Sequence, residues 1–278
     1  MTGPAMSSPS TILVERTGAV ATLSLYRPDV RNAMNPTMIG EIRAAFEGFT
    51  ADPGLRVVIL QGAGQGFCAG GDLNWMKDVL GQTEEEVVED SRNLLEMYKA
   101  IDSCPKLVIA RLHGAAVAGA LGIAACADIV VAEKNTKFCV SEVKIGLVPG
   151  IIAAFILPRT GPGWLRYLAK SAVTFDAETA RTAGLVHEIG DGAADLDARV
   201  AAHVAQALSS SPDAIARTGE LIEALGHKID EETFRKGLTF NAKARLSPEA
   251  QEGISAFLEK RRPSWFARPG GPKDGETA

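Results

Sequence analysis

Apolar and polar positions follow two different spacings along the first two thirds of the chain. Short apolar runs with the pattern of buried strands occur at residues 20–25, 55–60, 107–110 and 129–132. Helical spacing of apolar residues, or a uniformly small and apolar stretch, occurs at residues 36–49, 84–101 and 117–125. Asn35 and Pro36 are suited to the N-cap and first turn of the first of these helices. Strands that alternate with helices predict an α/β fold with helices packed on a sheet.

The last part of the chain has a different pattern. Helical spacing recurs there with short breaks, at residues 196–208, 212–225, 230–246 and 248–261. We therefore expect an α/β core over residues 11–195 and a helical C-terminal section over residues 196–265, which packs on the core or on another subunit. Residues 1–10 and 267–278 are rich in Pro, Gly and polar side chains, and we expect mobile tails there.

Composition narrows the class of protein. The chain has 278 residues, 46% hydrophobic and 23% charged, with a formal net charge of −5, as in ordinary globular proteins. Because it lacks a basic block, nucleic-acid and membrane partners are not expected. The longest uncharged run, residues 112–127, is too short for a membrane span, and the N-terminus does not resemble a secretory signal. We expect a cytoplasmic protein.

The cysteines and histidines do not form recognisable ligand patterns. The four cysteines lie far apart in apolar surroundings without a CxxC motif, which favours buried, reduced thiols. The four histidines have no spacing typical of a metal site, so no metal is expected.

A first glycine-rich segment follows the strand predicted at 55–60. Residues 64–69 formally match G-x-G-x-x-A, the dinucleotide fingerprint. A dinucleotide site also needs a strand that ends in an acidic residue about 20 residues later. The chain has the glutamate-rich start of a helix there instead, so a dinucleotide site is not favoured. Two interpretations remain open: a loop with several positive-φ residues, or backbone amides that approach a ligand oxygen.

A second glycine-rich segment, residues 113–128, leaves a strand and enters a helix of small residues. Gly119 at the start of that helix could present its amide to an oxyanion, because a helix N-terminus carries unpaired N–H groups and partial positive charge. Small residues could equally serve only close helix packing. The spacing alone does not decide between these alternatives.

Several separated motifs occur in a specific order. They are residues 31–35 (RNAMN), 66–73 (GFCAGGDL), 113–119 (HGAAVAG), 127–132 (ADIVVA), 138–150 (FCVSEVKIGLVPG) and 183–187 (AGLVH). Together they resemble the crotonase family of enoyl-CoA hydratases and isomerases, over about residues 11–265. The resemblance implies a crotonase-type ββα spiral core and a helical C-terminal section that builds trimers, often paired into hexamers.

The same resemblance implies roles for both glycine-rich segments. The amides of Gly71 and Gly119 would hold the thioester oxygen of an acyl-CoA, on which negative charge develops as an enolate. No cofactor is expected, since coenzyme A is part of the substrate. Asp72 and Asp128 are expected to be structural. The substrate- and CoA-binding set would be Arg31, Ala33, Ala69, Gly70, Gly71, Asp72, Leu73, Gly119 and Lys260, the last often supplied by a neighbouring subunit.

Hydratases of this family carry two glutamates, of which the chain matches one. Glu142 matches the first, and Gly122 stands where the second would be. The apolar residues between 138 and 148 suggest that the Glu142 segment is buried, which would raise the pKa of its carboxyl and suit it to general acid/base chemistry.

The leading hypothesis is an enoyl-CoA hydratase with Glu142 as acid/base, and the runner-up is a Δ3,Δ2-enoyl-CoA isomerase that uses Glu142 alone. A third hypothesis is a non-catalytic acyl-CoA-binding protein. Residues 68–76 and 141–149 resemble the branch that acts on methylglutaconyl-CoA or its isohexenyl relatives in leucine and terpene breakdown. Lys77 and Lys144 are candidates to bind the second carboxylate of such substrates.

Overall fold

A six-stranded sheet forms the centre of the molecule. The computed structural model describes residues 10–72, 74–75, 83–226, 248–249, 252–253, 256 and 259–266. The sheet has the order β1-β2-β3-β4-β6-β8. β1 and β2 form an antiparallel hairpin, and the other neighbours are parallel. The strands are β1 (Ile12–Thr17), β2 (Val20–Leu25), β3 (Val57–Gly62), β4 (Leu107–Leu112), β6 (Ile129–Glu133) and β8 (Glu188–Gly190).

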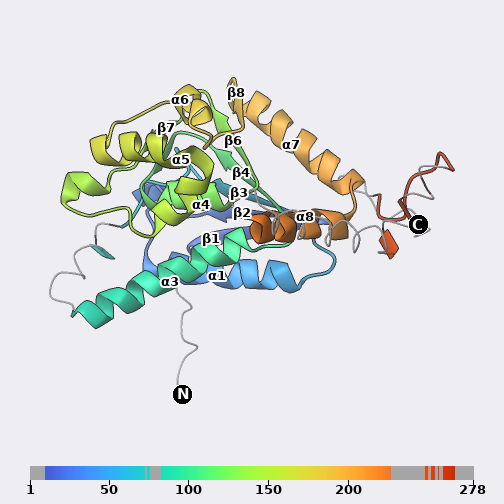
Figure 1. The fold of residues 1–278 in the computed structure, drawn as a ribbon, viewed down its shortest axis with the longest axis horizontal. Helices are drawn as coiled ribbons and strands as arrows, with labels where there is room; N and C mark the ends of the chain where they lie inside the picture. The colour runs from blue at the N-terminus through green and yellow to red at the C-terminus, as the bar shows by residue number, and fades with distance from the viewer. Residues whose placement is uncertain are drawn as a thin grey trace, which may run out of the picture.

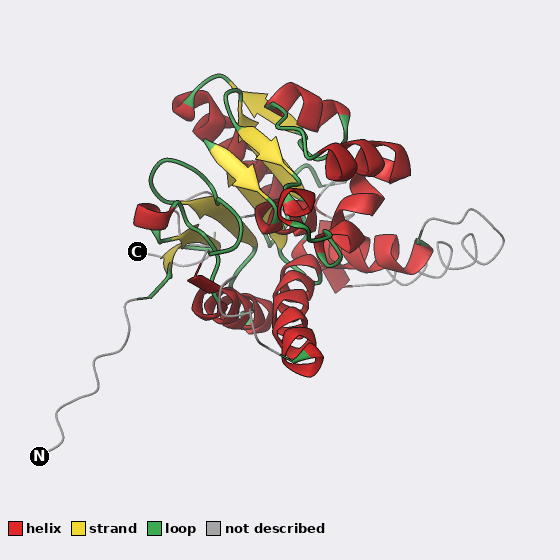
Figure 2. Cartoon of the chain, turned by 90° about the vertical axis from the view of Figure 1, so that its left-hand side faces the viewer, coloured by secondary structure: helices red, strands yellow, loops and turns green. Residues whose placement is uncertain are grey.

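Helices cover both faces of this sheet (Figures 1 and 2). On β3, Val58 faces a large core shared with α1, α3, α4 and α5, while Val57 faces a smaller core with α7. This period of two explains why the parallel strands are apolar on both sides. The helices are α1 (Pro36–Ala51), α3 (Glu84–Asp102), α4 (Gly119–Cys126), α5 (Ile152–Ser171), α6 (Ala177–Thr182), α7 (Ala193–Ser209) and α8 (Pro212–Leu225), with 3₁₀ turns η1 (Pro28–Val30) and η2 (Glu142–Ile145).

A second, two-stranded parallel sheet pairs β5 (Ala115–Val117) with β7 (Lys137–Cys139). Isolated bridges extend it, from Ala116 to Cys68 on one side and from Phe138 to Phe175 on the other. These strands have only three residues each, too few for their sequence to predict them. They bring together segments that lie far apart in the chain.

The expected α/β layout is confirmed. All four predicted strands are present, and α1 begins as expected, with the Asn35 side chain accepting a hydrogen bond of 2.9 Å from the Met38 amide. α8 matches the helix predicted at 212–225. The helix predicted at 230–246, most of that at 248–261, and the tails at 1–9 and 267–278 lie outside the described residues.

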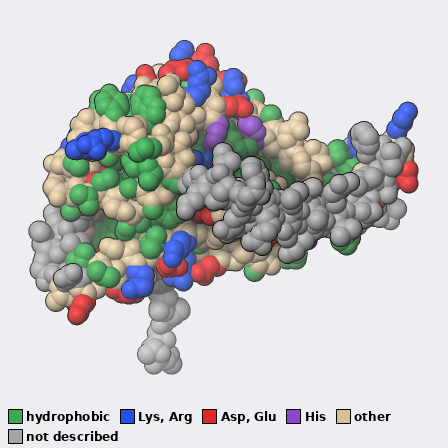
Figure 3. Space-filling view, in the orientation of Figure 1, with side chains coloured by type: hydrophobic (Ala, Val, Ile, Leu, Met, Phe, Trp, Pro, Cys, Tyr) green, Lys and Arg blue, Asp and Glu red, His purple; other side chains and the backbone are tan. Residues whose placement is uncertain are grey.

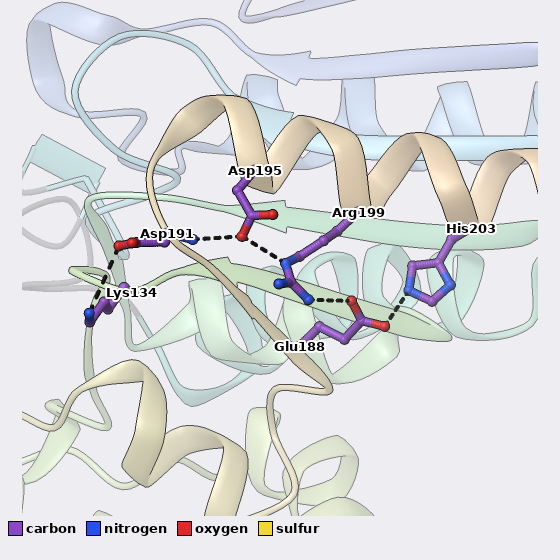
Figure 4. A network of polar contacts seen from close by, with 6 residues as sticks. All are labelled: Lys134, Glu188, Asp191, Asp195, Arg199 and His203. Carbon is purple, nitrogen blue, oxygen red and sulfur yellow. Dashed lines mark hydrogen bonds and ion pairs between the residues drawn. The ribbon is translucent and has the colours of Figure 1, made fainter.

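α7 packs on the sheet through Leu196, Val200 and Val204. Since this helix begins at Ala193, the expected boundary between residues 195 and 196 falls within its first turn. A polar network on the surface also joins α7 to β8 (Figure 4). The network comprises Lys134, Glu188, Asp191, Asp195, Arg199 and His203. Exposed ion pairs of this kind each contribute little stability.

All four cysteines are free thiols, as predicted, with Cys68, Cys126 and Cys139 buried and Cys104 half-buried. Burial raises the pKa of the Cys68 thiol to about 12, so it remains protonated and unreactive. Within the described part of the chain, no helix is long and apolar enough to cross a bilayer.

Candidate active site

Backbone pairing brings three distant segments together at one end of the small sheet. The Val117 amide donates to the Cys68 carbonyl (3.1 Å), and the Ala118 amide donates to the Cys139 carbonyl (2.8 Å). Residues 68–71, 115–119 and 137–142 therefore lie side by side. Each of them carries one of the residues expected to act on the substrate: Gly71, Gly119 and Glu142.

The peptide between Gly70 and Gly71 has a fixed orientation. Its carbonyl accepts a hydrogen bond of 2.7 Å from the Met34 amide. Because a trans peptide directs its N–H opposite to its carbonyl, the Gly71 N–H points away from Met34. It has no acceptor among the described residues. Gly70 adopts φ 97°, a conformation that favours glycine and turns the chain at this point.

The peptide between Ala118 and Gly119 is oriented in the same way. The Ala118 carbonyl accepts from the Leu121 amide (2.9 Å), so the Gly119 N–H points out of the N-terminus of α4. No described residue accepts from it. A Cβ on Gly119 would lie too close to Cε of Met34 and 3.0 Å from the Tyr98 hydroxyl, so a side chain here would displace the Met34 side chain. Both expected oxyanion donors are thus backbone amides that have no acceptor within the described part of the chain.

Ala118 has strained backbone geometry, with φ 49° and ψ −120°. Such a conformation costs a residue with a Cβ about 1–3 kcal/mol and persists only where its surroundings hold it. The bond from the Ala118 amide to Cys139 is one such support. The strained residue directly precedes the Gly119 amide.

Glu142 begins η2, a few residues after the strand that pairs with β5. Its Oε2 atom is buried and has no hydrogen-bond partner among the described residues. Burial raises the pKa of its carboxyl above the ordinary value. A buried carboxyl oxygen without a partner can exchange a proton with a substrate, which is what the expected acid/base role requires.

The expectation that apolar neighbours bury the whole segment is wrong in part. Phe138 and Val140 are buried, but four large apolar residues after Glu142 are exposed to solvent. They are Val143 (39%), Ile145 (59%), Leu147 (53%) and Val148 (77%). The 3₁₀ turn and the extended stretch that follows it turn these side chains outward, so the Glu142 carboxyl owes its burial to other contacts.

We call Val143, Ile145, Leu147 and Val148 the apolar strip. Further exposed apolar side chains, Leu157 and Tyr167, lie on the following helix, α5. In Figure 3 green side chains gather where Figure 1 places α5. Contiguous apolar surface of this kind commonly marks a contact with another molecule.

Gly122 has no space for a side chain. A Cβ there would lie 2.8 Å from Cγ2 of Ile152 and 2.8 Å from Cε1 of Tyr98. The place of the family's second glutamate is therefore filled by packed side chains. Tyr98 lies in the helix that the sequence predicts at 84–101, but nothing in the local pattern shows that its side chain reaches α4.

The turn at residues 31–33 lies beside the Gly71 loop, since the Ala69 amide donates to the Arg31 carbonyl (3.0 Å). Arg31 is exposed and Ala33 is buried. The buried Asn32 between them fixes the loop: its side-chain amide donates to the carbonyls of Gly66 (2.9 Å) and Phe67 (3.1 Å). Sequence reasoning missed Asn32, whose only signal was a polar residue inside the first motif.

Asp72 and Asp128 have the structural roles expected of them. Asp72 pairs with Arg27 (2.8 Å) and accepts from the Asn74 amide (2.8 Å). Burial alone would raise the pKa of Asp72, but these contacts outweigh it and hold the pKa below the ordinary value. Asp128 accepts from the amide of Val108 in β4 (2.7 Å). Leu73 and Lys77 lie outside the described residues.

The structure does not bring Lys260 to this site within one chain. Lys260 is exposed, and its segment is joined to the core where the Trp265 carbonyl accepts from Arg56 (2.6 Å). Arg56 precedes β3, whereas the Gly71 loop follows the other end of that strand. Lys144 is exposed and lies two residues from Glu142. Among the described residues, no group of three His, Cys, Asp or Glu side chains is arranged to hold a metal ion.

Comparison with known proteins gives a consistent result. The family model described as enoyl-CoA hydratase/isomerase matches residues 15–268. The chain is 33% identical to a Thermus thermophilus protein provisionally named enoyl-CoA hydratase, over 88% of this chain and 97% of that protein. It is 30% identical to the 1,2-epoxyphenylacetyl-CoA isomerase of Escherichia coli, over 90% and 95%.

Solved structures agree on the fold. The crystal structure of an enoyl-CoA hydratase from Shewanella pealeana superposes with a TM-score of 0.88 at 35% identity, covering 92% of this chain and 96% of that one. The expected crotonase-type fold is thereby confirmed.

Proposed function

Because this chain belongs to the enoyl-CoA hydratase/isomerase family, we propose that it adds water across the 2,3 double bond of a 2-enoyl-CoA thioester. The observation that carries the proposal is the buried, unpartnered Oε2 of Glu142, beside the segments that hold the two unpaired amides. Relatives named enoyl-CoA hydratase support this reaction over others of the family.

The proposed steps use Glu142 alone as acid and base. Its carboxylate takes a proton from water as the water oxygen bonds to C3 of the substrate. The electron pair of the double bond moves toward the thioester oxygen, where the Gly71 and Gly119 amides stabilise the enolate. Protonated Glu142 then delivers its proton to C2 and returns to the carboxylate form. Donors of this kind typically contribute about 3–4 kcal/mol each to lowering the barrier.

Isomerisation of a 3-enoyl-CoA is the second candidate. The packing of Tyr98 and Ile152 over Gly122 favours it, because a second carboxylate has no room there. A single base suffices to move a proton from C2 to C4, and the reaction needs no activated water. A relative named as an isomerase of a different acyl-CoA supports this alternative.

For the substrate, we propose a branched methylglutaconyl-type acyl group. The motifs around residues 68–76 and 141–149 support it, and Lys144 is a described cation within two residues of Glu142. Loss of its charge in Lys144→Met should then lower kcat/KM for 3-methylglutaconyl-CoA about tenfold and leave crotonyl-CoA unaffected, the effect of a solvated ion pair with a substrate carboxylate. Equal effects on both substrates would rule out this role.

We further propose that the active form is a homotrimer or a dimer of trimers, which would cover the apolar strip and supply Lys260 from a neighbouring subunit. The reaction as written uses only water and the acyl-CoA, so we propose that no cofactor or metal is needed. Activity should then survive exhaustive chelation and gel filtration.

Loss of the absorbance of the conjugated enoyl thioester tests the proposal directly. Crotonyl-CoA and 3-methylglutaconyl-CoA would be assayed in parallel, and fast loss with either one supports hydration. No loss with either, but appearance of the same absorbance from a 3-enoyl-CoA, would transfer the assignment to the isomerase. Binding of acyl-CoA without turnover of any enoyl-CoA would contradict both and leave a binding protein.

A further inference from the structure

Tyr98 joins α3 to the start of α4 at the candidate site. The residue has no exposed surface, and its hydroxyl donates a hydrogen bond of 2.9 Å to the Gly119 carbonyl. Its ring packs against Phe155, with 5.4 Å between ring centroids, and covers Gly122. Tyr98 therefore fills the place of the absent second glutamate and touches the residue that carries the α4 oxyanion donor.

This complete burial decides what Tyr98 can do. A hydroxyl that water does not reach is no substitute for the absent carboxylate as an acid, a base or a ligand of the attacking water. Burial also raises the pKa of Tyr98 well above its ordinary value, so the hydroxyl stays protonated and remains a hydrogen-bond donor. Its effect on the reaction must pass through Gly119.

The Gly119 amide lies between two anchored peptides. On one side the Ala118 amide donates to the Cys139 carbonyl, and on the other the Gly119 carbonyl accepts from Tyr98. Between these anchors is the strained turn at Ala118, followed by a glycine that by itself tolerates many backbone angles. The Leu121 amide also holds this peptide through the Ala118 carbonyl, but that bond lies within the first turn of α4. Without the Tyr98 bond, the first turn is free to relieve the strain by rotation about Gly119, which turns the donor amide away.

We propose that Tyr98 is a positioning residue, which holds the Gly119 amide in the direction needed to bind the thioester oxygen. The inference rests on the proposed function, since it presumes an acyl-CoA oxygen at that amide. It differs from a purely structural role in one measurable respect. A core-packing residue affects stability, whereas a positioning residue also affects how strongly the bound thioester is polarised.

The test compares Tyr98→Phe with the unmodified protein. Phenylalanine keeps the ring over Gly122 and removes only the hydroxyl. The probe is 2,4-hexadienoyl-CoA, whose absorption moves to longer wavelength when donors polarise its conjugated thioester on binding. Tyr26→Phe, at an exposed tyrosine that follows β2, is the matched control. Steady-state kcat and KM with a hydrated substrate complete the comparison.

We expect Tyr98→Phe to bind the probe with a smaller shift to longer wavelength. We also expect its kcat to fall about tenfold or more, while its KM stays within about twofold of that of the unmodified protein. The loss in kcat is smaller than the roughly 10²–10³-fold that follows removal of a whole oxyanion donor, because the Gly119 amide is still present. Tyr26→Phe should match the unmodified protein in all three measures. If Tyr98→Phe does not fold, the probe spectrum of Ala118→Gly replaces it. This variant removes the strain but keeps the Tyr98 bond, so the shift should be kept; loss of the shift would mean that the Ala118 turn and not Tyr98 holds the amide, and would overturn the proposal.

The outcomes separate this inference from the function on which it rests. The role of Tyr98 is overturned if the unmodified protein and Tyr98→Phe polarise the probe equally and turn over substrate equally fast. The proposed function is then left intact. An unmodified protein that binds the probe without any shift overturns both.

Discussion

Cγ2 of Ile152 lies 2.8 Å from the point at which a Cβ on Gly122 would stand. Gly122 thus lies between tightly packed side chains, with Ile152 of α5 on one side and the Tyr98 ring on the other. We call this packed group of three residues the closed wall. The side chains of Ile152 and Tyr98 occupy the space that a second carboxylate would need. We therefore propose that Glu142 carries all the acid/base chemistry.

The closed wall predicts that Gly122→Ala is destabilising. The added methyl group would push on Ile152 and Tyr98 at less than contact distance, and overpacking of this kind costs about 1–3 kcal/mol. Chemical denaturation measures the free energy of unfolding. Gly48→Ala is the matched control, because Gly48 lies inside α1 with open space around it and should gain about 0.5–1 kcal/mol. Equal stability changes in the two variants would mean that the wall is not tightly packed.

Glu142→Gln should stabilise the protein at neutral pH. The folded-state pKa of Glu142 is raised, so the group favours folding below its unfolded-state value of about 4.5, and this contribution is lost as pH rises through the folded-state pKa. Glutamine has no charge to lose. The variant should gain about 0.5–2 kcal/mol at pH 7, the range typical of relieved active-site groups, and the difference should vanish below pH 4. A difference that is independent of pH would contradict the buried position of this carboxyl.

Arg27→Met should be strongly destabilising, because it leaves the buried carboxylate of Asp72 without its ion-pair partner. Breaking one side of such a pair costs about 3 kcal/mol or more. The pKa of Asp72 is lowered in the folded state. The ionised Asp72 carboxylate therefore stabilises the fold at pH values above its unfolded-state pKa of about 3.8, and this stabilisation is lost as pH falls through the folded-state pKa. Thermal unfolding should therefore show a smaller difference in stability between Arg27→Met and the unmodified protein at acidic pH than at neutral pH.

Arg43→Met is the control for this prediction. Arg43 pairs with Glu47 on the exposed face of α1, and loss of that pair should cost no more than about 0.5 kcal/mol at any pH. Similar losses in the two arginine variants would show that Asp72 does not depend on its partner.

Much of the fold could be predicted because its periodicity is local. The apolar spacing of α1 and its Asn35 cap are both legible in the sequence, as are the runs that form β3, β4 and β6. β5 and β7 could not be predicted, because three-residue strands owe their existence to each other and to the Cys68 loop.

Side-chain environment was harder to predict than secondary structure. The apolar residues after Glu142 suggested burial, yet in a single chain Val148 is 77% exposed, since an apolar pattern does not distinguish a core from an interface. From the sequence, Gly122 showed only that the second glutamate of the family is missing. A residue without a side chain next to a catalytic segment indicates that something bulky fills the space, but the identity of Tyr98 depends on how α3 crosses α4.

The apolar strip predicts the effect of a charge on assembly. Val148→Asp should reduce the molar mass measured by light scattering from that of a trimer or hexamer to that of a monomer, because an interface disfavours a buried unpaired charge. Val14→Asp, at a similarly apolar but separate exposed site on β1, should leave the mass unchanged. A Val148→Asp protein that keeps its mass would exclude the strip from the subunit interface.

The most direct test of the account is the rate of Glu142→Gln on whichever enoyl-CoA the unmodified protein converts fastest. Removal of the proposed acid/base group should lower kcat by about 10²–10⁴ while the acyl-CoA still binds, since the two backbone amides are untouched. A Glu142→Gln variant that retains the full rate would show that Glu142 is not the acid/base group, and the proton transfer would then belong to another group.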